Sequence, residues 1–107
     1  MNHRIKEMVA EIEDNLSQLL TTQVLADFIG VSASRLQHIF KQEVGVSPMK
    51  YIKNLRLQKA CELLGTTKLS IKEIRAKVGI KNESHFIFDF KQKFGATPNE
   101  YRRNFYE

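Results

Sequence analysis

The sequence is poor in the residues that build disulfide frameworks and membrane anchors. It has one cysteine among 107 residues, Cys61, which excludes an internal disulfide framework and a cysteine-rich zinc site, and indicates a reducing compartment. Cys61 itself is expected to be a small core residue. No apolar run approaches the roughly 18 residues of a membrane span. Because the N-terminus alternates charged and apolar residues, unlike a signal peptide, we expect a cytoplasmic protein with no membrane partner.

Patterns typical of enzymes and metalloproteins are also missing. The three histidines, His3, His38 and His85, are too dispersed to form a metal site, so we expect no metal and no other cofactor. The sequence contains no recognisable motif for a nucleophile–base pair, a phosphate-binding loop or a catalytic pair of carboxylates. The sequence is therefore not expected to encode an enzyme.

The sequence does contain enough apolar residues for a core, and an excess of positive charge. Hydrophobic residues make up 42% of the chain, which argues against disorder. Seventeen Lys and Arg against 12 Asp and Glu give a net charge of +5. Residues 1–20 carry a net −2, so the remainder carries +7. A basic body of this kind favours a polyanionic partner over an acidic small substrate.

Apolar spacing predicts helices along almost the whole chain and no strand. Seven apolar residues predict a first amphipathic helix over 3–20: Ile5, Met8, Val9, Ile12, Leu16, Leu19 and Leu20. Cap residues, glycines and prolines place the other helices at about 22–29, 33–44, 48–64, 70–78, 83–94 and from Pro98 onward. The Ser70–Glu73 and Thr97–Glu100 segments read as capping boxes. The fold class is therefore all-α, with about seven helices.

One segment of the chain is repeated. Residues 31–48 and 80–98 share a Phe-Lys-Gln triplet, a glycine and a Ser/Thr-Pro pair. Gly30 before the first copy corresponds to Gly79 before the second, and the second copy has one extra residue between that glycine and the shared triplet. Two short helices joined by a tight turn with glycine describe a helix-turn-helix. Two such units in one basic chain suggest a repeating target, and duplex nucleic acid is the obvious one.

The spacing of many residues along the chain is specific: Ala26, Gly30, Leu36, Phe40, Lys41, Gly45, Val46, Ser47, Pro48, Tyr51, Arg56, Leu57, Ala60, Leu63, Leu64, Ser70, Ile71, Ile74, Val78, Gly79, Phe86, Phe90, Lys91, Phe94, Gly95, Thr97, Pro98, Tyr101 and Arg102. In these residues the sequence resembles the DNA-binding domain of AraC/XylS-type bacterial transcription regulators, over about residues 5–104.

The resemblance implies two helix-turn-helix subdomains joined by a long central helix, with boundaries at 1–46, 47–65 and 66–107. It implies recognition helices over 33–44 and 83–94 that enter successive major grooves of double-stranded DNA. It further implies action near promoters, often as an activator that touches RNA polymerase. Relatives of this kind commonly carry a ligand-sensing or receiver domain in a longer chain.

The first recognition helix offers polar side chains on its outward face. Ser34, Arg35, Gln37 and His38 are candidates for base contacts, and all but Arg35 match positions to which the resemblance assigns that role. Gln37 suits adenine and Arg35 suits guanine, because both side chains bond bidentately to those bases. Lys41 is the candidate for a phosphate contact.

The second recognition helix departs from this pattern. Its matching candidates for base contact are Ser84, His85, Ile87 and Phe88, where the family has a small polar residue and arginine in place of Ile87-Phe88. Phe88 is expected to pack on a neighbouring helix or partner domain, and the alternative is contact with thymine methyl groups. Phosphate contacts are expected from three lysines: Lys81, Lys91 and Lys93. We therefore expect the first helix to dominate base reading.

Two other features bear on function. Arg75 stands where the family has alanine, so the helices of the second unit are expected to cross at a wider distance. The apolar Ile87-Phe88 pair and the acidic first helix support an alternative function, a helical protein-interaction module with weak or lost DNA reading. A third possibility is a segment that targets an attached enzyme or sensor to DNA.

Overall fold

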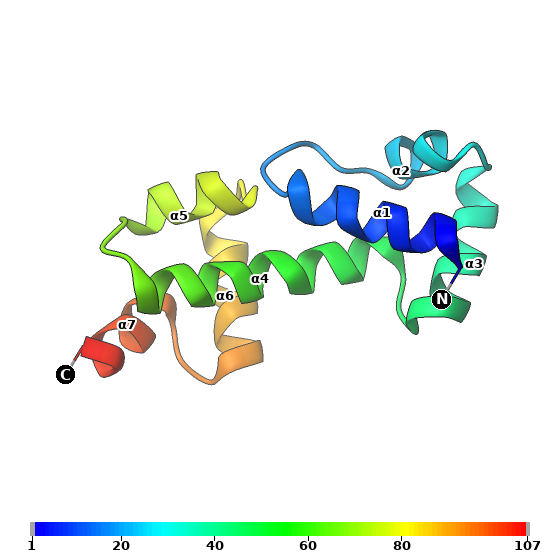
Figure 1. Ribbon diagram of the computed structural model, residues 1–107. Coiled ribbons are helices and arrows are strands. Elements are labelled where there is room, and N and C mark those ends of the chain that lie inside the picture. Colours follow the sequence, from blue (N-terminus) through cyan, green and yellow to red (C-terminus); the bar gives the residue numbers. More distant parts are fainter. Residues whose placement is uncertain (1, 107) are drawn as a thin grey trace. The chain divides into compact units, whose positions relative to one another are not determined.

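The computed structural model describes residues 2–106 of this protein, and these residues form helices and no strand (Figure 1). The helices are α1 (His3–Asp14), α2 (Thr22–Ile29), α3 (Ala33–Val44), α4 (Pro48–Thr66), α5 (Ile71–Val78), α6 (Glu83–Phe94) and α7 (Pro98–Tyr106). The all-α prediction is confirmed. Within residues 2–106, no helix is both long and apolar enough to cross a membrane.

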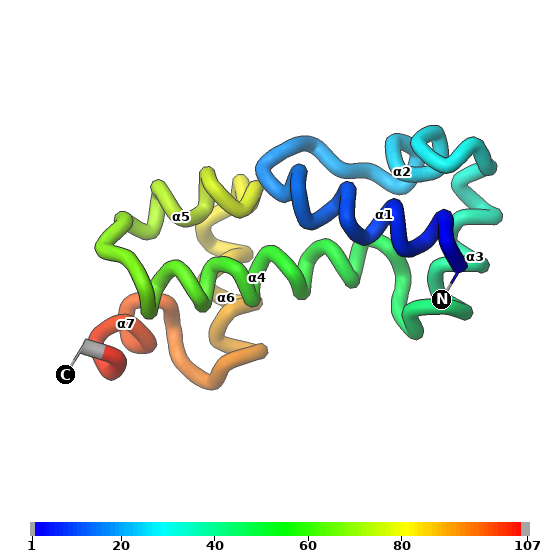
Figure 2. The backbone as a smooth tube through the Cα atoms, in the orientation of Figure 1, coloured from blue at the N-terminus to red at the C-terminus, as the bar shows by residue number. Residues whose placement is uncertain are grey.

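The chain forms two compact units that share α4. The first unit ends at Leu55 and the second begins at Arg56, and the path through each can be followed in Figure 2. The division falls inside α4, and the separate central segment expected over residues 47–65 stays a prediction.

The core of the first unit is formed by apolar side chains from α1 and the turn after it, α2, α3 and the start of α4. Its buried members are Ile5, Met8, Ile12, Leu16, Leu25, Ala26, Ile29, Leu36, Phe40 and Ile52. Ala26 is fully buried, and because its side chain is small, α2 and α3 can approach closely. Tyr51 of α4 packs edge-on against the Phe40 ring at 5.7 Å between centroids. This core holds α3 with one face inward.

The core of the second unit is built around Phe90. Its buried members are Leu57, Ala60, Leu64, Ile74, Val78, Phe86 and Phe90. The Phe90 ring lies 5.7 Å from Phe86, 4.6 Å from Phe94 and 5.8 Å from Tyr101, between centroids. Cys61 is partly buried against this cluster, in agreement with the expected packing role.

Arg102 ties α7 to the end of α4. Its guanidinium donates to the carbonyl oxygens of Leu64 at 3.2 Å, Thr67 at 3.2 Å and Leu69 at 2.5 Å. Leu64 lies in the last turn of α4, where carbonyls have no partner within the helix, and Thr67 and Leu69 lie in the connector after it. The guanidinium therefore satisfies carbonyls that would otherwise need water. The helix α4 is itself longer than predicted, because it continues to Thr66 and not only to Leu64.

The prediction of one helix over residues 3–20 is wrong, because α1 ends at Asp14. The side-chain amide of Asn15 donates to the Glu11 carbonyl at 2.9 Å and to the Glu11 carboxylate at 3.1 Å. Asn15 has left the helical region, with φ −130° and ψ 32°. Side chains of this type compete with the helix for backbone hydrogen bonds. Leu16 is still buried, but Leu19 is 70% exposed and does not belong to the predicted apolar face.

Two capping boxes start α5 and α7, as predicted. The Ser70 N–H donates to the Glu73 carboxylate and the Glu73 N–H donates to the Ser70 hydroxyl, both at 3.0 Å. Thr97 and Glu100 make the same pair of bonds at 2.9 Å and 3.2 Å. In each box the backbone N–H, and then the hydroxyl, of the cap residue lowers the pKa of the glutamate below its usual 4.5.

These boxes predict an acid-sensitive contribution to stability. A carboxylate with a lowered pKa in the folded state stabilises the protein above the unfolded value of 4.5, and this contribution is lost as the pH falls through the lower folded value. Substituting both Glu73→Gln and Glu100→Gln keeps an acceptor in each box but removes the titration. The melting temperature, measured from pH 7 to pH 3, should fall less steeply below pH 4.5 in this variant. An unchanged steepness would contradict this role.

Candidate nucleic-acid interface

The turn between α2 and α3 fixes where α3 begins. Gly30 adopts the left-handed conformation with φ 73°, which L side chains rarely adopt. The Val31 N–H donates to the Ala26 carbonyl at 3.0 Å, and the Ser32 hydroxyl accepts the Arg35 N–H at 3.1 Å. Each end of the turn is therefore hydrogen-bonded, and α3 starts as predicted at Ala33.

The outward face of α3 carries all of the polar side chains predicted for it. Ser34, Gln37, His38 and Lys41 follow the i, i+3, i+4, i+7 spacing of one helix face, with Arg35 beside them. All five are exposed. On the opposite side Leu36 and Phe40 are completely buried, so the core fixes which face is presented. A rigid helix with such a polar face can place donors and acceptors against base edges in a major groove.

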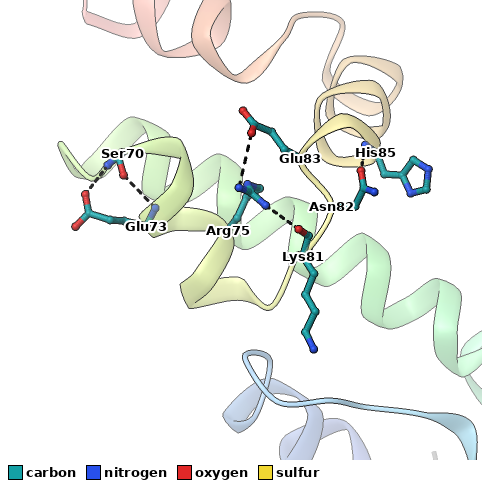
Figure 3. A network of polar contacts seen from close by, with 7 residues as sticks. All are labelled: Ser70, Glu73, Arg75, Lys81, Asn82, Glu83 and His85. Carbon is teal, nitrogen blue, oxygen red and sulfur yellow. Dashed lines mark hydrogen bonds and ion pairs between the residues drawn. The ribbon is translucent and has the colours of Figure 1, made fainter.

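The turn between α5 and α6 repeats this design with one more residue. Gly79 is left-handed with φ 80°, and the Ile80 N–H donates to the Arg75 carbonyl at 2.9 Å. Lys81 is the additional residue, and its side chain is exposed. The Asn82 side-chain oxygen then accepts the His85 N–H at 2.8 Å and caps α6 (Figure 3). The predicted start of α6 at residue 83 is confirmed.

The outward face of α6 is more apolar than that of α3. Ser84, Phe88 and Lys91 occupy the positions of Ser34, His38 and Lys41. All of the residues predicted to contact DNA from this unit are exposed: Lys81, Ser84, His85, Ile87, Phe88, Lys91 and Lys93.

Phe88 and Lys93 are placed differently from the other predicted contacts. Phe88 is 63% exposed, so the expected packing on a neighbouring helix is wrong within its own unit. Phe86 and Phe90 fill the core on the inward face of α6. Phe88 lies on the opposite side of the helix and points away from them. Lys93 lies about half a turn from Ser84 around the helix, with its ammonium 5.8 Å from the centroid of the Phe94 ring.

Sequence reasoning missed a polar contact behind this face. It predicted from Arg75 only a wider helix crossing, but the Arg75 guanidinium reaches the turn (Figure 3). One terminal nitrogen donates to the Lys81 carbonyl at 2.9 Å, and the other lies 3.8 Å from a Glu83 carboxylate oxygen. In the sequence, the features that could have indicated this contact are the long donor side chain of Arg75 and the extra residue, Lys81, in the turn after it. Among residues 2–106 no three His, Cys, Asp or Glu side chains gather as a metal site would require.

Comparison with known proteins identifies the family. A helix-turn-helix domain model matches residues 25–104. An uncharacterised HTH-type transcriptional regulator of Bacillus subtilis, YfiF, is 37% identical over 98 residues, which cover 92% of this chain and 31% of that protein. The chain spans about a third of the length of the curated relatives that it matches.

Two solved structures share the fold. A transcriptional regulator from Chromobacterium violaceum, described as of AraC DNA-binding type, is 36% identical with a TM-score of 0.84, covering 94% of this chain and 89% of that one. The C-terminal domain of AraT, a response regulator from Geobacillus stearothermophilus, is 36% identical with a TM-score of 0.89, covering 96% and 86%. This chain belongs to the AraC-type helix-turn-helix DNA-binding domains of transcription regulators.

Proposed function

We propose that this chain binds double-stranded DNA in a sequence-specific manner as part of a bacterial transcription regulator. In this proposal α3 and α6 enter successive major grooves, and α3 does most of the base reading. The exposed polar face of α3, backed by buried Leu36 and Phe40, carries the proposal. The net charge of +5 supports a polyanionic partner.

The side chains of α3 and α6 account for their different proposed roles in base reading. Ser34, Arg35, Gln37 and His38 offer donors and acceptors to base edges, whereas Ile87 and Phe88 offer only apolar contact, for which a thymine methyl is the matching group. Lys41, Lys81, Lys91 and Lys93 contact phosphates in this proposal. Ser84 and His85, in the first turn of α6, are the polar groups left to read bases from the second unit.

Selection of bound sites from random duplexes, followed by alanine substitution, tests the proposal. Substituting Gln37→Ala and His38→Ala together should weaken binding to the selected duplex by roughly 5- to 150-fold, the effect of one bidentate base contact. Binding to a scrambled duplex should change little, because phosphate contacts dominate it.

The matched control is Ile87→Ala with Phe88→Ala, at the corresponding positions of α6. Its loss of affinity for the selected duplex should be the smaller one. A larger loss from the α6 pair would overturn the dominance of α3, and selection that yields no preferred sequence would overturn specific reading.

The partners beyond DNA are also proposals. We infer contact with RNA polymerase near a promoter from the resemblance to the family alone. We also infer a sensory or receiver domain elsewhere in a longer natural chain, because the chain spans only about a third of its curated relatives. The 63% exposure of Phe88 favours a second candidate, a docking contact with such a domain or partner. Retention of protein partners, together with salt-insensitive behaviour and no DNA binding, would favour that candidate over DNA reading.

A further inference from the structure

The side chain of Arg75 distinguishes the second turn from the first. Ala26 holds the corresponding place in the first unit. The carbonyl oxygens of the two residues make the same bond, since each accepts an N–H from the residue after the turn glycine, at 3.0 Å from Val31 and 2.9 Å from Ile80. The backbones of the two turns therefore start in the same way, and the difference lies in the guanidinium.

The Arg75 guanidinium holds the chain on both sides of the residue that caps α6. It donates to the Lys81 carbonyl at 2.9 Å and lies 3.8 Å from the Glu83 carboxylate (Figure 3). Asn82, which caps the helix, stands between these two contacts. The Arg75 side chain is only 15% exposed, whereas that of Glu83 is 61% exposed. The guanidinium is thus largely buried, with one hydrogen bond to the turn and one longer ion pair to the first residue of α6.

Stability alone explains this arrangement poorly. The Nε atom of Arg75 is buried without a hydrogen-bond partner, and a buried donor left unpaired destabilises the folded state. The ion pair with exposed Glu83 adds little, because solvent screens it. A planar guanidinium does have one advantage over other side chains, because it makes two contacts in a fixed geometry.

We infer that Arg75 is a positioning residue that holds the N-terminal end of α6 in the orientation needed to read DNA. This inference rests on the proposed function. Ser84 and His85 lie in the first turn of α6, and both are exposed. The N-terminal residues of a recognition helix contact base edges, and a hydrogen bond to a base weakens steeply when its angle changes. Arg75 therefore affects reading without touching DNA.

Replacing Arg75 with Met tests this role, since Met keeps an unbranched stem but has no donor. The exchange rate of the His85 amide hydrogen should rise about tenfold, as should that of its neighbours, because a charge-assisted hydrogen bond that holds the turn is lost. The affinity ratio between the selected duplex and one scrambled in the second half-site should fall about tenfold for the same reason. Lys77→Met removes the same charge from an exposed site on α5 and should change neither quantity.

Two further variants complete the test. Arg75→Lys keeps the charge but has a single donor nitrogen, so its changes in exchange rate and affinity ratio should be smaller than those of Arg75→Met. If Arg75→Met fails to fold, Glu83→Gln weakens one of the two contacts and should shift both quantities less, in the same direction.

The outcomes separate this inference from the proposed function. Unchanged exchange in Arg75→Met would overturn the positioning role, and changed exchange with an unchanged affinity ratio would overturn its link to reading. A wild-type protein that prefers no duplex would overturn the proposed function and the reading role together, while the exchange rates still decide whether Arg75 holds the helix end.

Discussion

Replacing Phe90 with alanine is expected to destabilise the protein by about 3–5 kcal/mol. The Phe90 ring is fully buried and makes close ring contacts with Phe86, Phe94 and Tyr101. Removing it forfeits the burial of the ring, leaves a cavity and breaks three aromatic pairs at once. Because small domains are stable by only about 5–15 kcal/mol, a large part of the free energy of unfolding would be lost. The free energy of unfolding is measured by urea denaturation, monitored by circular dichroism.

Phe88→Ala is the matched control, on the same helix and of the same chemistry. Phe88 is 63% exposed, so its truncation should change the free energy of unfolding by no more than about 0.5 kcal/mol in either direction. If the two variants were destabilised equally, Phe88 would be covered by other parts of the folded chain, and its availability for DNA or a partner would be contradicted.

The helices that bear the candidate contacts could be predicted because their boundaries are set by local chemistry. Thr21, Ser32 and Asn82 each accept the backbone N–H three residues ahead, and left-handed glycines end α2 and α3. Such bonds depend on residues within one turn of each other, and a sequence shows them directly. The exposed face of α3 followed from the same spacing, since Leu36 and Phe40 point inward.

The end of α1 could not be predicted from apolar spacing alone. Leu16 and Leu19 continue the helical period, but the side chain of Asn15 takes up the Glu11 carbonyl and the chain turns. Leu16 is buried after the turn and Leu19 is not. Periodicity counts apolar residues and takes no account of a polar side chain that competes for the backbone.

The contacts of Arg75 and the exposure of Phe88 depend on tertiary structure. Arg75 has a long side chain with several possible directions, and only the folded turn shows that its guanidinium meets the Lys81 carbonyl. Phe88 was expected to find a packing partner because exposed large apolar groups usually have one. In the second unit the core is already filled by Phe86 and Phe90. The repeated scaffold was thus predictable from the sequence, and the differences between the two outward faces only in part.

The affinity for DNA is expected to fall steeply with salt. If four lysines contact phosphates, log affinity should fall with log salt at a slope of about −3.6, so that affinity drops roughly 150-fold between 50 and 200 mM salt. Substituting Lys41→Met and Lys91→Met removes one such contact from each recognition helix. The slope should then become shallower by about 2, with little change in the preference for the selected duplex. Fluorescence anisotropy at several salt concentrations measures the slope.

Lys6→Met provides the control for charge alone. Lys6 is exposed on α1, outside both recognition helices, so its loss should leave the slope nearly unchanged. A change in slope from Lys6 half as large as that from the Lys41 and Lys91 pair would be an equal change per charge removed. It would mean that binding follows net charge, and not phosphate contacts at the recognition helices. Comparing the single Lys41 and Lys91 variants then decides whether α6 contributes affinity. A helix that reads few bases still changes the slope when its lysine lies against a phosphate, because counterion release does not depend on sequence.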